Sequence, residues 1–351
     1  MDALTSSAFS SRSDERLLLH CSNYQGEAFI HLRADGTPIL SRGFKEQNGR
    51  ASPLSLSGQL KAEARWGIVL ALPAMIGFVV WVAGPIVASL GFSFSSWNAG
   101  GRFRFVGLNN YFRMVRTDKL FWKSLFVTTY YSLTSIPLTL LFAFAIAVLL
   151  NRKVIGISFF RTLLYLPSVA PSVAVAMLWL WLYNPDFGLL NYLLGLIGLP
   201  KFLWIHDEAQ VIPSFVLMNI WRMGGPMVIF LAALQGIPAS LYEAAELDGG
   251  GWWSKLRYIT VPLSTPAFFF NAVMGIISSF QVFNEAYIMT DGGPNNASLF
   301  LVYYVYLNAF RYGRMGYASA LAWALFIVIL LLTLLMFRIS RNWVYYETKG
   351  R

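Results

Sequence analysis

Charged and amide side chains are rare in the long apolar stretches of this chain, so each one found there requires a physical reason. Arg222 lies within one such stretch, and an ionisable group at membrane depth costs at least about 2.5 kcal/mol. Asn219 precedes it and Gly224-Gly225-Pro226 follows it, so we expect a loosened helix lining a polar passage. The alternative is that Arg222 extends to the membrane interface or pairs with an acidic residue for assembly.

A second set of polar residues recurs at three-, four- and seven-residue steps, which predicts one shared helical face: Asn271, Ser278, Gln281, Asn284 and Glu285. Amide and carboxyl groups on such a face, with nearby rings at Phe280, Phe283 and Tyr287, suit the hydroxyl groups and rings of a sugar. The alternative is hydrogen bonding between helices or subunits. An ion pair between Glu285 and Arg222 would likewise stabilise the structure rather than bind a substrate.

Segment 241–266 concentrates charge between two apolar runs, 211–235 and 267–290. Ser240 followed by Glu243 has the spacing of a capping box, which predicts a short helix. Three glycines from Gly249 end that helix, and a second amphipathic turn follows over 252–258. We expect two short helices with a break between them, which together form a docking element.

The elements that must position these residues are membrane helices. The 351 residues are 56% hydrophobic and 13% charged, with a mean hydropathy of +0.54, which excludes an ordinary soluble domain. Six apolar runs are long enough to cross a bilayer core of about 30 Å: 66–92, 124–150, 159–183, 211–235, 267–290 and 318–337. The predicted fold class is therefore an all-α integral membrane protein with six transmembrane helices.

The distribution of basic residues predicts the orientation of these helices. Seventeen Lys and Arg residues fall in the segments that share a side with both termini, and nine fall on the opposite side. This bias places the N- and C-termini in the cytoplasm, although the basic loop 93–123 opposes it. The net charge of +10 then reflects topology, and nucleic-acid binding need not be invoked.

Residues 1–65 form a polar cytoplasmic N-terminal extension whose composition is typical of disordered segments. Within it, 28–40 has the pattern of a small hairpin around Asp35-Gly36. The role of this extension stays open.

The charged segment has a recognisable motif. Glu243-Ala244-Ala245, Gly249, Ile259 and Val261-Pro262 resemble the E-A-A-x3-G-x9-I-x-L-P loop of the membrane-spanning subunits of binding-protein-dependent ABC importers. Asp248 and Ile237-Pro238 are further similar to the carbohydrate branch, the maltose- and glycerol-phosphate-type permeases. The departures are Gly250 where Ala is usual, Leu256 where an aromatic is usual, and Val261 for Leu. With the T-x-G-G-P-like turn at 290–294, the resemblance extends from 66 to the C-terminus.

The resemblance implies a six-span permease domain over 66–351, with a cytoplasmic coupling helix in the docking loop 241–266. It implies that the following residues couple the chain to an ATPase: Glu243, Ala244, Ala245, Asp248, Gly249, Ile259 and Pro262. The implied partners are a second homologous permease subunit, an ABC ATPase dimer and an extracytoplasmic solute-binding protein. The chain would be a non-catalytic subunit in the bacterial inner membrane, binding no cofactor itself, with ATP and Mg on the ATPase subunits.

Other functions lack the residues they need. No GxxxxGK[ST] loop occurs, so a nucleotide must be bound by separate subunits. An ion-coupled carrier would usually have internal repeats and a relay of intramembrane carboxylates, and only Glu285 is acidic within the predicted spans. Cys21 and three histidines offer no metal-ligand spacing. Whether the carbohydrate is neutral, phosphorylated or acidic stays open, as does the choice between a heterodimer and a homodimer.

Overall fold

The computed structural model describes residues 18–23, 26–32, 38–41, 53–98, 100–101, 103–152 and 155–345. The chain divides into two compact units, Met1–Gly77 and Phe78–Arg351.

The N-terminal unit contains a three-stranded antiparallel sheet, ordered β1 (Leu18–Asn23), β2 (Gly26–Leu32) and β3 (Pro38–Ser41). β2 and β3 pair with Phe29 opposite Ser41, so the predicted hairpin is confirmed, while Asp35-Gly36 lies outside the described residues. The described part of the extension thus contains a sheet, which adds strands to a chain predicted to be all-α. Helix α1 (Pro53–Phe78) begins well before the predicted span.

Three membrane-spanning candidates are continuous helices. They are Glu63–Ser93, which runs through α1, η1 (Val79–Ala83) and α2 (Gly84–Ser93), then α4 (Lys119–Leu150) and α15 (Met315–Ser340). At a rise of about 1.5 Å per residue each is longer than the bilayer core. Asp118 begins α4 by accepting hydrogen bonds from the backbone N–H groups of Leu120 and Phe121 at 2.9 and 3.1 Å.

Three further candidates are bent pairs of helices, which makes six spans if each pair crosses once. Helices α5 (Ile157–Val169) and α6 (Ser172–Leu182) meet at 98°, and α8 (Val211–Trp221) and α9 (Gly224–Gln235) meet at 46°. The third pair joins 252–263 to α13 (Thr265–Ser279) at 58°. The prediction of six membrane segments agrees with this count.

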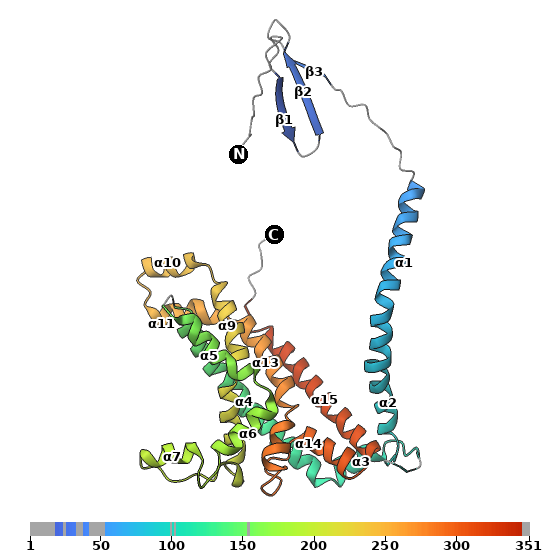
Figure 1. Cartoon of the computed structure of the whole chain (residues 1–351), viewed down its shortest axis with the longest axis vertical. Helices are drawn as coiled ribbons and strands as arrows, with labels where there is room; N and C mark the ends of the chain where they lie inside the picture. Colours follow the sequence, from blue (N-terminus) through green and yellow to red (C-terminus); the bar gives the residue numbers. More distant parts are fainter. Residues whose placement is uncertain are drawn as a thin grey trace. The chain divides into compact units, whose positions relative to one another are not determined.

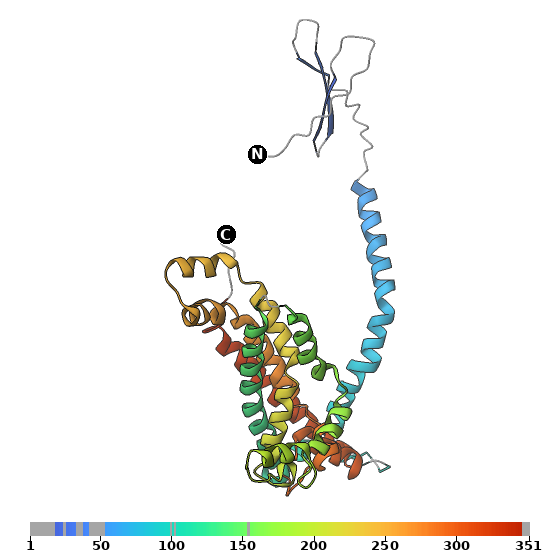
Figure 2. The same cartoon turned by 60° about the vertical axis from the view of Figure 1, so that its left-hand side comes forward.

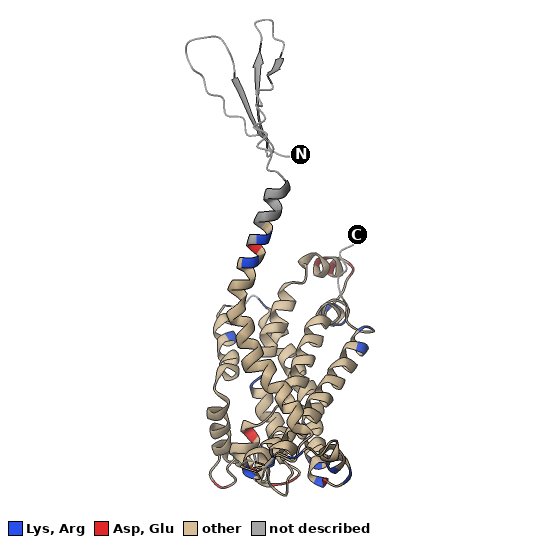
Figure 3. Cartoon of the chain, turned by 90° about the vertical axis from the view of Figure 1, so that its right-hand side faces the viewer, with Lys and Arg blue, Asp and Glu red and all other residues tan. Residues whose placement is uncertain are grey.

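The described residues of the second unit form a helical bundle without strands (Figures 1 and 2). α4 packs against α8, α9 and α13. Helices α10 (Ala239–Leu247) and α11 (Trp252–Lys255) lie at one end, here called the α10 end. Helices α3 (Asn109–Arg116), α7 (Leu189–Leu196) and α14 (Leu301–Tyr306) lie at the other, the α14 end. Lys, Arg, Asp and Glu lie mainly at these two ends, and uncharged residues, drawn in tan, lie between them (Figure 3).

The apolar core of this bundle is divided into two clusters along α4. One cluster contains Phe121, Val127 and Tyr131 with residues of α8, α14 and α15, and the other contains Ala143, Phe144 and Ala147 with residues of α9 and α13. The stretch of α4 between these clusters carries Ser132, Ser135 and Thr139, all of them buried. A polar layer therefore separates two apolar ones.

The segment 301–310 is apolar and rich in tyrosine but too short to span, a pattern that predicts a helix in the membrane interface. The structure instead places Leu301, Tyr303 and Tyr304 of α14 in the core, each at most 5% exposed. The Tyr304 hydroxyl reaches Asp118 at 2.6 Å, so a tyrosine-rich helix can be buried here because a partner accepts its hydrogen bond. α7, the other segment of this kind, is largely exposed.

Candidate functional site

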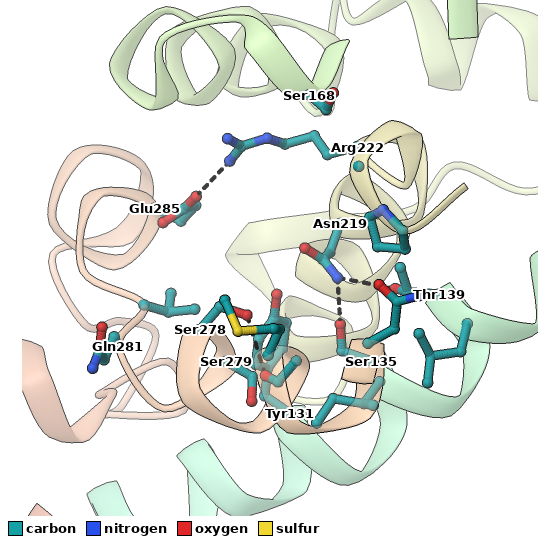
Figure 4. Close-up of a pocket in the computed structure, with 18 of the residues that line it drawn as sticks. Tyr131, Ser135, Thr139, Ser168, Asn219, Arg222, Ser278, Ser279, Gln281 and Glu285 are labelled. Carbon is teal, nitrogen blue, oxygen red and sulfur yellow. Dashed lines mark hydrogen bonds and ion pairs between the residues drawn. The ribbon is translucent and has the colours of Figure 1, made fainter. Parts of the chain in front are cut away.

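A cavity of about 710 Å³ opens in the middle of the bundle, with walls from α4, α5, α8, α9, α13 and the chain that follows α13 (Figure 4). It brings together all six residues that the sequence predicts for a substrate pathway: Asn219, Arg222, Ser278, Gln281, Asn284 and Glu285. These residues are up to 66 positions apart in the sequence, so only the packing of bent helices makes them neighbours.

The loosened helix predicted around Arg222 is present. α8 ends at Trp221, α9 begins at Gly224, and Arg222 lies in the break between them. A Cβ atom at Gly224 would lie 2.7 Å from the carbonyl oxygen of Leu164, so only glycine allows α9 to begin this close to α5. The break places the Arg222 side chain in the cavity (Figure 4).

Arg222 and Glu285 form an ion pair, with Nη1 and Oε1 3.3 Å apart. The pairing that the sequence left open as an alternative is therefore observed. The two side chains remain 25% and 15% exposed, respectively, within the cavity wall. They are the only charged residues that line the cavity among the described residues, so their opposite charges leave its wall without net charge.

Asn219 connects α8 to α4. Its amide nitrogen donates hydrogen bonds to Ser135 Oγ at 2.8 Å and Thr139 Oγ1 at 3.0 Å. The sequence analysis missed both α4 residues, as well as Tyr131 in the same wall. A signal for them existed, because Tyr131, Ser135 and Thr139 recur at four-residue steps, which places them on one face of α4.

The prediction of a single helical face from Asn271 to Glu285 is wrong. α13 ends at Ser279, and helical structure resumes only at Asn284, before η4 (Ala286–Thr290). Gln281 lies in the non-helical stretch and is exposed. Asn284 instead donates a hydrogen bond to Ser172 Oγ of α6 at 2.7 Å. Irregular backbone is tolerated at membrane depth where it lines a cavity, and this unwound stretch lines one.

Asn271, on the helical part of this segment, is 3% exposed and lines the same cavity. Its side-chain nitrogen makes no hydrogen bond among the described residues, which is unusual for a buried amide donor. The cavity wall thus offers one donor that a ligand could satisfy.

At the α10 end, the structure forms the predicted pair of short helices. None of the residues of α10 is buried, and Glu243, Ala244 and Asp248 are exposed, with Ala245 partly so. The predicted capping box is absent, because α10 begins at Ala239 after Pro238 and no side chain caps it. The fixed φ of proline starts the helix one residue before Ser240, which leaves Ser240 inside the helix rather than at its cap.

Gly249 ends α10 in the left-handed conformation, with φ of +78°, and its N–H bonds to the Glu246 carbonyl at 3.0 Å. A helical stretch of α11, η3 (Leu256–Thr260) and α12 (Val261–Leu263) follows, longer than the predicted turn. Ile259 and Pro262 are partly buried in this stretch. The Tyr242 and Thr260 hydroxyls, 3.1 Å apart, join it to α10.

The α14 end is held by a dense set of side-chain hydrogen bonds. Asp118 accepts bonds from the hydroxyls of Tyr304 and Tyr317 in addition to its two backbone contacts. Burial raises the pKa of the Tyr304 phenol, as does its bond to Asp118. At Asp291, the hydrogen bond from the Tyr303 hydroxyl, with Arg311 beside it, lowers the pKa of the carboxyl against the opposing effect of burial.

The sequence of residues 135–343 matches a protein family described as "Binding-protein-dependent transport system inner membrane component". More than half of the chain is covered. The chain belongs to this family of inner-membrane permease subunits of ABC importers, as the motif around Glu243 indicated.

Individual relatives agree with this assignment. The chain is 39% identical over 303 residues to the "Probable ABC transporter permease protein YesP" of Bacillus subtilis (strain 168), covering 85% of this chain and 98% of the relative. It is 29% identical over 293 residues to the "Trehalose/maltose transport system permease protein MalF" of Thermococcus litoralis, covering 82% and 98%.

Among solved structures, the chain resembles one chain of a bacterial alginate ABC transporter in complex with an alginate pentasaccharide-bound periplasmic protein. The TM-score is 0.71 at 22% identity, covering 80% of this chain and 96% of that one. At this identity the likeness concerns the fold, and it shows that the arrangement of bent helices in the second unit is that of an importer permease.

Proposed function

We propose that this chain forms part of the translocation pathway of an ABC importer for a carbohydrate, and that α10 transmits the motion of an ATPase to that pathway. The observation that carries the proposal is the central cavity. It collects amides, hydroxyls and one ion pair where two membrane segments are bent or unwound. A hydroxyl-rich solute needs such partners when it leaves water.

The α10 end would face the cytoplasm, with both termini on that side. The excess of Lys and Arg in the segments predicted to be cytoplasmic supports this orientation. The α14 end would then face the extracytoplasmic solute-binding protein.

α10 would insert into a cleft of an ABC ATPase dimer, which holds ATP and Mg²⁺, while this chain remains non-catalytic. No residue of α10 is buried, which supports a partner that covers this helix in the assembly. The small side chains of Ala244 and Ala245 would let α10 approach that partner closely. Glu243, exposed on this helix, would meet a basic group of the ATPase. Gly249 and the contact of Tyr242 with Thr260 would hold α10 as one rigid element, which the transmission of motion requires.

The substrate would be an oligosaccharide without net charge. The trehalose/maltose transport function in the name of one relative supports a saccharide. The pairing of Arg222 with Glu285 supports a neutral one, because the guanidinium is already balanced and is less suited to bind a uronate or a phosphate. A second, homologous permease subunit would complete the pathway.

The first test is purification of the chain from detergent-solubilised membranes, with identification of the proteins that accompany it. We expect an ABC ATPase and a second permease with the wild type, and loss of the ATPase with Glu243→Lys. The matched control is Glu208→Lys, an exposed acid in the chain between α7 and α8, which should retain the ATPase. A chain that purifies alone in all three forms would contradict the importer assembly.

The second test is uptake by proteoliposomes that contain the purified assembly. The probes are radiolabelled di- to pentasaccharides, some neutral and some built of uronates. ATP-dependent uptake of a neutral saccharide is expected, and preference for the uronate series would contradict the argument from the ion pair.

A further inference from the structure

Five aromatic rings cluster at the α14 end. They come from the segment after α13 with η4, and from α14 with η5 (Leu307–Arg311). Their members, here called the five-ring cluster, are Phe283, Tyr287, Tyr303, Tyr306 and Phe310.

Tyr306 lies at the centre of this cluster. Its ring centroid is 5.1 Å from that of Phe283, 5.5 Å from that of Tyr287 and 5.3 Å from that of Phe310. Phe283 and Tyr287 are stacked with an interplanar angle of 10°. Tyr303 is fully buried and anchors the cluster, whereas Tyr287 and Phe310 are 47% and 71% exposed. Parts of the Tyr287 and Phe310 side chains are therefore left uncovered by this chain.

The cluster is continuous with the central cavity. Phe283 lines the cavity wall, directly before Asn284 and Glu285 in the chain. Phe310 lies at the opposite, exposed edge of the cluster, beside Arg311. The rings thus extend from the cavity wall to the surface of the α14 end.

Charged groups lie at both edges of the cluster. Arg222 and Glu285 pair at 3.3 Å on the cavity side, and Arg311 and Asp291 pair at 3.2 Å on the surface side. The surface pair is more than half exposed. A cluster that faced lipid hydrocarbon would not have two ion pairs as neighbours, because charges there are costly.

A contrasting pair of aromatic rings lies on α4. Phe126 and Tyr130 are stacked at 6.2 Å with an interplanar angle of 4°, and both are exposed. Neither residue lines the cavity. Such a pair is typical of the aromatic belt at a membrane interface.

We propose that the five-ring cluster is a stacking subsite on which saccharide rings bind before they enter the cavity. This inference rests on the proposed carbohydrate function. A pyranose has C–H groups on its faces and hydroxyls at its edge. The faces suit the negative face of an aromatic ring, and the hydroxyls suit charged or amide groups beside it. Tyr287, Tyr306 and Phe310 supply the faces, and Asp291, Arg311 and Glu285 supply the polar edges.

The test uses the assembled transporter in proteoliposomes with the same radiolabelled saccharides. Tyr287→Ala and Phe310→Ala should each raise the KM for uptake about 3- to 10-fold, which corresponds to the loss of one aromatic contact. Phe126→Ala removes an exposed ring outside the five-ring cluster, and should leave the KM unchanged. Co-purification of the partner subunits is measured for every variant.

Binding is measured directly by tryptophan fluorescence of the detergent-purified assembly that carries Phe310→Trp. The control is the same assembly with Phe126→Trp. Saccharide should shift the tryptophan emission of the first variant only. Wild-type uptake with unchanged KM in both alanine variants would overturn the inference and leave the proposed function intact. Loss of a partner subunit from those variants would also overturn it, since the cluster would then be an interface. Absence of any saccharide uptake by the wild type would overturn the proposed function itself.

Discussion

The two ends of the bundle are built differently. At the α14 end, single polar side chains connect separate segments: Asn191 donates to the carbonyls of Pro185 and Phe202 and accepts from Phe202 and Trp204. At the α10 end, α10 has no buried residue, and its main side-chain contacts are one hydroxyl pair and one exposed ion pair.

This difference indicates where the chain is complete and where it needs a partner. Groups at the α14 end satisfy each other, so this end is stable within one chain. α10 has almost no tertiary contact of its own, and a nine-residue helix is marginal in water without one. In the proposed assembly, the ATPase surface that covers α10 would stabilise it.

The largest change in stability is expected from a substitution at the α14 end. Asp118→Ala removes the acceptor of two backbone N–H groups and of the hydroxyls of Tyr304 and Tyr317. We expect the free energy of unfolding in detergent to fall by about 3 kcal/mol. Asp186→Ala, an exposed acid at the same end, should change it by less than about 0.5 kcal/mol. Equal effects would show that the hydrogen bonds of Asp118 do not stabilise this end.

The next largest effect is expected from substitutions in the cavity, between the two ends. Arg222→Met or Glu285→Gln alone leaves one polar or charged group without its partner, at a cost of about 1–3 kcal/mol, so uptake should fall about tenfold. In the double variant the losses should not add, because the two groups act together. Additive losses would mean that the 3.3 Å contact carries no interaction energy.

A smaller effect on stability, with a large effect on assembly, is expected at the α10 end. Gly249→Val places a β-branched residue at φ +78°, a strain of about 1–2 kcal/mol that local unwinding of α10 would relieve. The free energy of global unfolding should change by less than about 0.5 kcal/mol, while the affinity for the ATPase should fall more than tenfold. Gly251→Ala is the control, since its φ is −71° and no atom crowds a Cβ there. A large loss of global stability in Gly249→Val would contradict the independence of α10.

The smallest effect concerns the exposed ion pair of Glu246 with Lys255. Glu246→Ala should lower the free energy of unfolding by about 0.3 kcal/mol, and this difference should vanish at high salt. Thermal unfolding at two ionic strengths measures it. A salt-independent loss above about 1 kcal/mol would mean that α10 is held by its own chain more firmly than its exposure indicates.

Much of the chain could be predicted from local pattern. The runs of apolar residues located the membrane segments, the sequence around Arg222 indicated a helix break, and Gly249 indicated the end of α10. Each of these depends on a property of neighbouring residues: hydropathy, backbone freedom or a missing Cβ atom.

Two of the errors of prediction share one cause. The regular spacing from Asn271 to Glu285 predicted one helix, but the helix ends at Ser279 because Asn284 and Glu285 bond to Ser172 and Arg222 on other segments. α14 was expected in the interface, but Asp118, 186 residues earlier, accepts the bond that lets Tyr304 be buried. Interactions at such separations leave no periodic trace in the sequence.

The sequence by itself determined the membrane class, the approximate spans and the family motif, since these depend on composition and on residues a few positions apart. Only the tertiary structure decided that six candidate residues line one cavity and that its two charges cancel. It also decided that a row of rings joins this cavity to the surface. These features depend on the angles at which bent helices pack, and those angles are set by contacts between residues far apart in the chain.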